Sequence, residues 1–346
     1  MNILFIDYRS IKAHQNFNKI HIDVLIRQGH VLTLLGKKGQ YDNIYDTPQL
    51  SKKVIPDVFF KKFPLAQISE RLREIICLFW IMKKFNLSSF DLIIIPTYDI
   101  LSFFLFRIKN KTLIINHNNV SQLDNKVKLW LTKTLPRHYI HIALNTRMRE
   151  QLIKLLPGMR VYYIPHGILN SEINERVPSF INKGVPFLFC PINSNFDFPF
   201  LQRIISSEEL DKYLKCTGQI LYVKKSIGLT TNSSNIIHTS SISDLDYNYM
   251  LSHAKTVLLP YGREFKYRCS GILFECVNFN VPVLATDIED MVIYKDVVNI
   301  TFFNDVSSLI DGLEKISQTS SPQRDNSSLY PDKYWEEIIK NVIDNA

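Results

Sequence analysis

Short, continuous runs of apolar residues recur along the chain, and helix-patterned segments separate them. The first half contains such runs at 2–7, 31–36, 91–97, 111–117, 139–145 and 160–167. A strand that is apolar at every position is buried on both faces, as in a parallel sheet covered by helices. Alternation of such strands with helices indicates βαβ units. The sequence therefore predicts an α/β fold built on a doubly wound parallel sheet.

The same alternation restarts after a polar segment, with apolar runs at 187–192, 219–225, 235–240, 256–261, 281–286 and 297–303. Helices are expected at 13–29, 67–85, 99–108, 118–135, 146–156, 198–207, 243–254 and 271–279. A chain of 346 residues favours two domains. We expect an N-terminal Rossmann-like domain at 1–167, a linker at 168–185, a C-terminal Rossmann-like domain at 186–330 and a final helix at 331–346.

The charge is unevenly distributed between the two halves. Residues 1–170 carry 25 Lys and Arg against 11 Asp and Glu, whereas residues 171–346 carry 16 against 22. A basic half indicates an anionic partner, such as lipid head groups, nucleic acid or a phosphorylated substrate. A solvated basic surface without a partner is the alternative. The lack of a helix-turn-helix, zinc-finger or RNA-binding signature argues against nucleic acid.

The cysteines and the lengths of the apolar runs indicate the cellular compartment of the protein. Five cysteines without a CxxC pair argue against a disulfide framework or a zinc site, and favour a reducing environment. The opening "MNILFIDYR" is typical of a first strand rather than a signal peptide. The longest strongly apolar run, 75–82, is too short to span a bilayer, which takes about 20 residues. We expect a cytoplasmic protein, peripheral at the inner face of the cell membrane.

The helix expected at 67–85 mixes four basic side chains with Phe79 and Trp80. This mixture is typical of a helix that lies on a membrane surface. It equally fits a helix whose aromatic side chains pack in the core while its basic face is solvated.

The most informative stretch is "TVLLPYGREFKYRCSGILFECVNFNVPVLAT", residues 256–286. In doubly wound sheets, ligands bind beyond the carboxyl ends of the strands. Here a strand leads through a basic loop to Ser270 and Gly271 at a helix start, where free amides bind anions and glycine permits close approach. Glu275 lies one turn further on nearly the same face, where it can accept hydrogen bonds from two ribose hydroxyls. An ordinary N-cap serine with a surface glutamate is the alternative.

This stretch resembles the donor-site segment of GT-B glycosyltransferases of the retaining family-4 type, also called group 1. Three other segments resemble that family in the same order: "MNILFIDYR…LIRQGHVLTLLG", "ALNTRMREQLIKLLPGMRVYYIPHGI" and "NIIHTSSISDLDYNYMLSHAKTVLLPY". Together they cover most of the chain. The resemblance implies the GT-B architecture of two Rossmann-like domains, with a C-terminal helix that crosses back to the N-terminal domain.

The resemblance also implies that the C-terminal domain binds a nucleoside diphosphate sugar as its substrate. The nucleotide is expected to be UDP or GDP, and no further cofactor is expected. The implied donor-binding residues are Glu275, Ser270, Gly271, Ile272, Lys224, Lys225, Arg263, Lys266, Arg268 and Asn193. The cations among them would neutralise the diphosphate leaving group. In the N-terminal domain, His117 matches a position where such enzymes place a catalytic histidine. His166 and Gly167 match a pair at the domain junction.

This chain departs from the family at one acidic position. The family's paired glutamates lie eight residues apart, but Tyr267 stands eight residues before Glu275. Glu264 is the nearest acid and is the catalytic candidate in this segment. It is therefore open whether the enzyme retains or inverts the configuration of the anomeric carbon of the donor sugar. An inverting enzyme would need a base in the N-terminal domain, for which the candidates are His14, Asp99 and His117.

Other polar side chains at strand ends are candidates for the acceptor site. They are His14, Asn16, Tyr98 and Asn118. Asp99 equally fits a turn or helix cap, and Asn118 or Asn119 fits a cap of the next helix. No His, Asp and Glu set has metal-ligand spacing, and the D-x-D of "SDLDYN" is expected to begin a helix. Metal-independent chemistry is therefore expected.

The sequence thus predicts a glycosyltransferase of the hexosyltransferase-like type. It would move a sugar to a lipid-linked or oligosaccharide acceptor in bacterial capsule, O-antigen or lipooligosaccharide assembly. It would meet an anionic membrane through the basic N-terminal domain. A nucleotide-sugar 2-epimerase on the same fold and a non-catalytic nucleotide-sugar-binding subunit are the alternatives.

Overall fold

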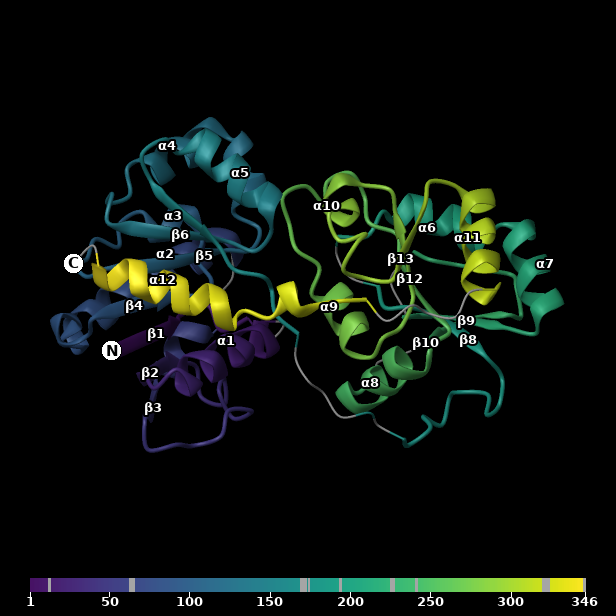
Figure 1. The fold of residues 1–346 in the computed structure, drawn as a ribbon, viewed down its shortest axis with the longest axis horizontal. Helices are drawn as coiled ribbons and strands as arrows, with labels where there is room; N and C mark the ends of the chain where they lie inside the picture. The colour runs from purple at the N-terminus through teal and green to yellow at the C-terminus, as the bar shows by residue number, and fades with distance from the viewer. Residues whose placement is uncertain are drawn as a thin grey trace. The chain divides into compact units, whose positions relative to one another are not determined.

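The strands of the described chain lie in two parallel sheets of seven and six strands (Figure 1). The computed structural model describes residues 1–346 except 12–13, 62–65, 169–172, 174, 193–194, 225–227, 240–241, 319–323 and 345–346. The chain divides into two compact units. The first contains Met1–Gly167, Tyr267–Cys269 and Leu329–Ala346, and the second contains Ile168–Lys266 and Ser270–Ser328. The predicted α/β class with two doubly wound sheets is confirmed.

The sheet of the first unit has the order β3-β2-β1-β4-β5-β6-β7. Its strands are β1 (Asn2–Asp7), β2 (Val31–Gly36), β3 (Leu50–Val54), β4 (Leu92–Ile95), β5 (Thr112–Asn116), β6 (Tyr139–Ala143) and β7 (Arg160–Tyr163). Strands β4, β5 and β6 are buried at every position, as their continuous apolar sequences predict. The order reverses at β1, so the loops after β1 and β4 form a topological switch point, where ligands bind in such sheets.

Helices cover both faces of this sheet. They are α1 (Gln15–Arg27), α2 (Ala66–Lys84), α3 (Ile100–Phe103), α4 (Lys126–Lys133), α5 (Thr146–Leu155) and α12 (Asp332–Asp344), with 3-10 turns at Asp57–Phe60, Leu87–Ser89, Val120–Asp124 and Ser327–Leu329. Crossovers between parallel strands are right-handed. The connections from β3 through to β7 all run in one direction along the sheet, so α2 to α5 share one face. The β1-to-β2 connection runs the other way and places α1 on the opposite face.

Two expected helices of this unit are shorter in the structure. The helix expected at 99–108 ends at Phe103, because Phe106 and Ile108 leave the helix to enter the core. The expected 118–135 helix is a 3-10 turn followed by α4, since the Asn125 side chain caps a new start by accepting from the backbone N–H groups of Val127 and Lys128. Asn119 caps neither helix. Its amide instead donates to the Tyr98 carbonyl at 3.0 Å.

The second unit has the strand order β10-β9-β8-β11-β12-β13. The strands are β8 (Phe187–Cys190), β9 (Ile220–Lys224), β10 (Ile236–Thr239), β11 (Thr256–Leu259), β12 (Val283–Thr286) and β13 (Ile300–Phe303). The helices are α6 (Phe198–Ile205), α7 (Glu208–Thr217), α8 (Asp244–His253), α9 (Gly271–Asn278), α10 (Glu289–Val292) and α11 (Val306–Gln318). The D-x-D of the sequence begins α8, as expected, with Ser243 as its N-cap.

The C-terminal helix α12 packs on the first unit beside α1 (Figure 1). Trp335 is fully buried there, and its indole N–H donates to Nδ1 of the equally buried His21 at 2.9 Å. The predicted return of the last helix to the N-terminal domain is confirmed. Among the described residues, none of the helices has the length and apolarity needed to cross a lipid bilayer.

Candidate functional site

Two histidines from different loops stack at the carboxyl edge of the first sheet. His14 lies just before α1 and His117 directly follows β5. Their rings are nearly parallel, with centroids 4.1 Å apart, and His14 Nδ1 lies 2.9 Å from the hydroxyl oxygen of Thr97 in a hydrogen bond. Burial, with a smaller contribution from the charge of Arg9, lowers the pKa of His14 to about 4. Burial, with nearby histidines, lowers the pKa of His117 well below its usual range. Both imidazoles are therefore neutral at pH 7, and the same burial makes each of them a weaker base than an exposed histidine.

Phe17 of α1 joins this pair to two further histidines. Its ring lies 4.5 Å from His117, 4.2 Å from His21 and 5.0 Å from His166, between centroids. Burial lowers the pKa of His21 to about 3 and that of His166 to about 4. Three imidazoles thus pack around one phenyl ring and the fourth, His14, stacks on one of them, in a buried cluster that keeps each uncharged. Among the described residues, no group of His, Cys, Asp and Glu side chains has metal-binding geometry.

Asp7, the last residue of β1, supports the loop that carries His14. Its side chain is fully buried and accepts from the Ser10 backbone N–H at 2.8 Å, from the Asn18 amide at 2.9 Å and from the Gln40 amide at 3.0 Å. Burial outweighs these hydrogen bonds and raises the pKa of Asp7 to about 6. This residue is not among those predicted from the sequence, although an aspartate at the end of a buried first strand was the available signal.

Tyr98 and Asp99 follow β4 and point to different partners. Tyr98 is buried, and its hydroxyl donates to the Asn116 side chain at 2.7 Å. Asp99 caps α3 by accepting from the Ser102 N–H, and it also lies 3.6 Å from the Arg71 guanidinium. Asp99 thus has the cap role that the sequence allowed. The other acceptor candidates, Asn16 and Asn118, are exposed.

An ion pair lies beneath the same loops. Arg9 Nε donates to the almost fully buried Glu74 of α2 at 2.8 Å. The second carboxylate oxygen of Glu74 accepts from the Ser102 hydroxyl at 2.6 Å. Burial raises the pKa of Glu74. Both carboxylate oxygens of Glu74 are thus hydrogen-bonded, one to Arg9 in the loop after β1 and one to Ser102 of α3, which follows β4. These contacts hold the two segments in one arrangement.

In the second unit, α9 begins at a polar N-cap in the segment that follows β11. Ser270 is the N-cap, and its hydroxyl accepts from the Leu273 N–H at 3.1 Å while sharing a 2.6 Å hydrogen bond with the Tyr261 hydroxyl. Gly271 and Ile272 form the first turn and are partly exposed. Free N–H groups in a first turn, with glycine beside them, are suited to an anion.

Glu275 lies one turn along α9 and is partly buried. The hydroxyl of Tyr247, on α8, donates to its Oε2 atom at 2.9 Å. Burial raises the pKa of Glu275 to about 7, although the Tyr247 hydrogen bond acts in the opposite direction. Tyr247 is not predictable from the sequence pattern, because it lies 28 residues before Glu275 and the two side chains meet only in the folded unit.

The cationic candidates are spread over the second unit and one segment of the first. Arg263, Glu264 and Lys266 are exposed on the loop after β11, and Lys224 ends β9. Lys225 and Asn193 lie outside the described residues. Arg268 belongs to the first unit, where its carbonyl accepts from the Asn145 amide at 2.9 Å and its Nε donates to the Ser121 hydroxyl at 3.4 Å.

Two doubly wound parallel units, with the last helix returning to the first unit, define the GT-B fold. No protein-family model matches the chain, and no curated protein sequence matches it. Solved structures match it over nearly its whole length.

Three of these structures illustrate the match. A UDP-forming α,α-trehalose-phosphate synthase from Burkholderia vietnamiensis has 9% identity and a TM-score of 0.64, covering 99% of this chain and 98% of its own. The Anabaena protein HepE, in complex with UDP and glucose, has 14% identity and a TM-score of 0.61, covering 100% of each chain. A UDP-GlcNAc 2-epimerase from Methanocaldococcus jannaschii has 11% identity and a TM-score of 0.62, covering 98% of this chain and 99% of its own. These likenesses show the fold.

Proposed function

We propose that this protein is a glycosyltransferase that moves a sugar from a nucleoside diphosphate sugar to a membrane-linked glycan. The observation that carries the proposal is the set formed by Ser270, Gly271 and Glu275 on α9, beyond the carboxyl end of β11. It combines an anion-binding helix start with a carboxylate one turn away. The GT-B fold and the UDP-glucose and UDP complexes of HepE support a nucleotide-sugar ligand for this set.

In this proposal the donor binds through two kinds of contact. The Glu275 carboxylate accepts hydrogen bonds from the two ribose hydroxyls, with Tyr247 holding the carboxylate in place. The amides at the start of α9 bind the diphosphate, and Lys224, Arg263 and Lys266 add positive charge. The cations stabilise the charge that develops on the leaving nucleoside diphosphate, so we propose metal-independent transfer.

The bond to the leaving phosphate breaks through an oxocarbenium-like transition state. We propose retention, in which the leaving phosphate accepts the proton of the acceptor hydroxyl on the same face of the sugar. The alternative is inversion, for which the stacked His14 and His117 at the carboxyl edge of the first sheet are the proposed bases.

We propose that the first unit binds the acceptor. Asn16 and Asn118 are exposed near the stacked histidines and can hydrogen-bond sugar hydroxyls. The excess of Lys and Arg over residues 1–170 favours a lipid-linked acceptor at an anionic membrane, as in bacterial capsule, O-antigen or lipooligosaccharide assembly.

A nucleotide-sugar 2-epimerase is the second candidate. The cluster of four histidines joined through Phe17 and His117 favours it, because moving a proton at a sugar carbon needs an acid and a base beside the sugar. Solved 2-epimerase structures also share the fold over 98% or more of this chain.

One experiment separates the candidates. Purified protein is incubated with each of a panel of UDP and GDP sugars, with and without membranes that carry lipid-linked glycans, and the products are separated by chromatography. If the protein is a transferase, nucleoside diphosphate is released and the sugar appears in the lipid fraction, and both results require membranes. Conversion of the sugar nucleotide into its 2-epimer without membranes would show that the protein is an epimerase and not a transferase. Absence of both reactions from a protein that binds one of the sugar nucleotides would support a non-catalytic binding subunit.

A further inference from the structure

The outer surface of α2, α3 and α4 in the first unit combines exposed apolar and basic side chains. These helices share one face of the sheet, α2 packs against α3, and α3 packs against α4. We call this surface the α2–α4 face. Its apolar residues are Leu72, Ile76, Phe79, Leu105, Val127 and Trp130.

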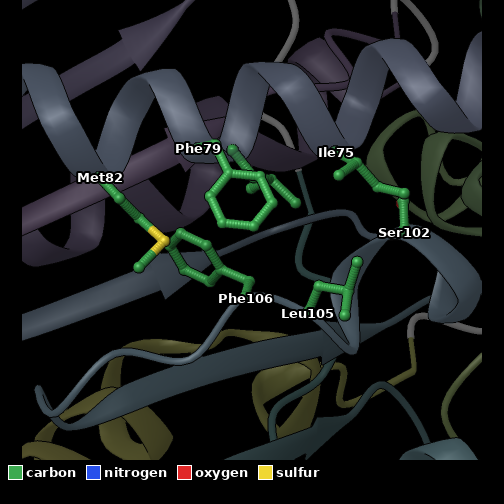
Figure 2. A pocket seen from close by; sticks show the side chains of 7 residues that line it. Ile75, Phe79, Met82, Ser102, Leu105 and Phe106 are labelled. Atoms are coloured by element: carbon green, nitrogen blue, oxygen red, sulfur yellow. The ribbon is translucent and has the colours of Figure 1, made fainter.

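On α2 the exposed apolar residues form a single stripe. Leu72, Ile76 and Phe79 are spaced by four and three residues, so they lie on one side of the helix. The Phe79 side chain is 47% exposed, and it also lines a shallow apolar groove with Met82 of α2 and Leu105 and Phe106 of the segment after α3 (Figure 2). The stripe ends at the exposed Lys83, one turn beyond Phe79.

On α4 a second apolar pair faces solvent. Val127 and Trp130 are one turn apart and are 61% and 62% exposed. The exposed Lys133 lies one turn beyond Trp130. The Arg107 guanidinium, which follows α3, donates to the Thr134 carbonyl and so ties that segment to the end of α4. Exposed aromatic residues on helices of one sheet face, with lysines beside them, are typical of surfaces that enter the interfacial layer of a bilayer.

The charge of this region favours an anionic lipid over other partners. Residues 71–137 contain eleven Lys and Arg against four Asp and Glu, and one of those acids, Glu74, is buried in an ion pair. Lysines near an anionic leaflet strengthen binding, whereas apolar side chains at the centre of the face add nothing to phosphate contacts on a nucleic acid.

We propose that the α2–α4 face docks on an anionic lipid bilayer, with Phe79 and Trp130 entering the interfacial layer and the surrounding lysines meeting lipid phosphates. This inference rests on the membrane-linked acceptor of the proposed function and assigns the surface that meets the membrane. It needs no nucleotide sugar, so it is tested separately from sugar transfer.

The test is flotation of the full-length protein with vesicles of phosphatidylcholine and phosphatidylglycerol, and with vesicles of phosphatidylcholine alone. The wild-type protein floats with the anionic vesicles and not with the neutral ones. The exposed lysines of this face are Lys83 and Lys84 at the end of α2, and Lys126 and Lys133 at the two ends of α4. Replacement of these four by glutamine weakens this binding about 100-fold, since each lysine near the surface strengthens it several-fold. The Phe79→Ser and Trp130→Ser double variant weakens it about tenfold.

Matched controls make the result specific to this face. Ile343→Ser, at a similarly exposed apolar residue of α12, leaves vesicle binding unchanged. Glu275→Ala also leaves it unchanged, so loss of donor binding and loss of docking are distinguished. Tryptophan emission shifts to the blue on anionic vesicles in the wild type and not in Trp130→Phe. Equal flotation of the wild type and the double variant would overturn the proposal. Tight binding to duplex DNA that depends on the lysines and not on Phe79 and Trp130 would also overturn the proposal, because the face would then be a nucleic-acid-binding surface.

Discussion

Glu275 is subject to two opposing effects. Burial on α9 disfavours its charged form, and the Tyr247 hydroxyl favours it, with burial prevailing so that the pKa is raised to about 7. A carboxylate can accept from two ribose hydroxyls, whereas the protonated acid has one oxygen committed to its own proton. The charge state of this residue should therefore control donor binding near neutral pH.

The first prediction concerns the pH dependence of that binding. Below pH 7 the acid is mostly protonated and binds ribose poorly, and above pH 7 it is mostly ionised. Affinity for the sugar nucleotide should rise about tenfold between pH 6 and pH 8 and then level off. Calorimetric titration at several pH values measures it. Glu275→Gln should bind weakly without this rise, and a wild-type affinity that falls over the same range would contradict the assignment.

The second prediction concerns Tyr247. Tyr247→Phe removes the hydrogen bond that favours the charged carboxylate, so the pKa of Glu275 should rise further. The midpoint of the pH dependence of donor binding should move to higher pH, with a loss of affinity of about tenfold at pH 7. At high pH the affinity should approach that of the wild type. An unchanged midpoint would mean that Tyr247 does not act through Glu275.

The third prediction concerns Asp7. Asp7→Ala leaves the amides of Asn18 and Gln40 buried without their acceptor. The free energy of unfolding should fall by about 1–3 kcal/mol, measured by urea denaturation. Asp23→Ala, which removes a more exposed ion pair with Lys19, should change it by less than about 0.5 kcal/mol. Equal effects of the two substitutions would contradict the supporting role of Asp7.

At the scale of a single element, α11 contains a glycine that helix propensity disfavours and that packing against β12 requires. Gly312 lies in the middle of this helix, and a Cβ atom there would come within 2.6 Å of Leu284 Cδ2 on β12. Alanine favours a helix by about 1 kcal/mol over glycine, but overpacking costs about 1–3 kcal/mol.

The fourth prediction follows from this contact. Gly312→Ala should lower the free energy of unfolding of the second unit by up to about 2 kcal/mol, because the fully buried Leu284 has little room to move away and the clash offsets the gain in propensity. Denaturation followed by circular dichroism measures it. A stabilised Gly312→Ala protein would show that α11 lies further from β12 than described.

Element boundaries show where sequence reasoning succeeds and where it fails. Continuous apolar runs located most of the strands, because burial on both faces leaves a pattern in the sequence. The length of α3 could not be read in the same way. Phe103, Phe104 and Phe106 fit a helix as well as they fit a chain that turns into the core. The choice depends on tertiary contacts that the local sequence does not contain.

At the scale of the whole molecule, the ordered motifs predicted the GT-B fold, whereas the candidate sites were only partly predictable. His14 and His117 were each identified from their places at loop and strand ends, but their stacking joins residues 103 positions apart. Arg268 follows Lys266 closely in sequence, yet it belongs to the first unit. Short-range patterns locate strand ends, and only the folded chain brings them together.

The central claim is that Glu275 and the start of α9 bind a nucleoside diphosphate. The most direct measurement is a thermal-shift screen of the wild type, Glu275→Ala and a matched control, Glu314→Ala on the exposed side of α11, against UDP, GDP, CDP, ADP and CMP. One diphosphate should raise the melting temperature of the wild type and the control but not of Glu275→Ala. At a hundred times the dissociation constant the stabilisation is about 2.7 kcal/mol. No shift with any nucleotide, or an equal shift in all three proteins, would contradict the donor site.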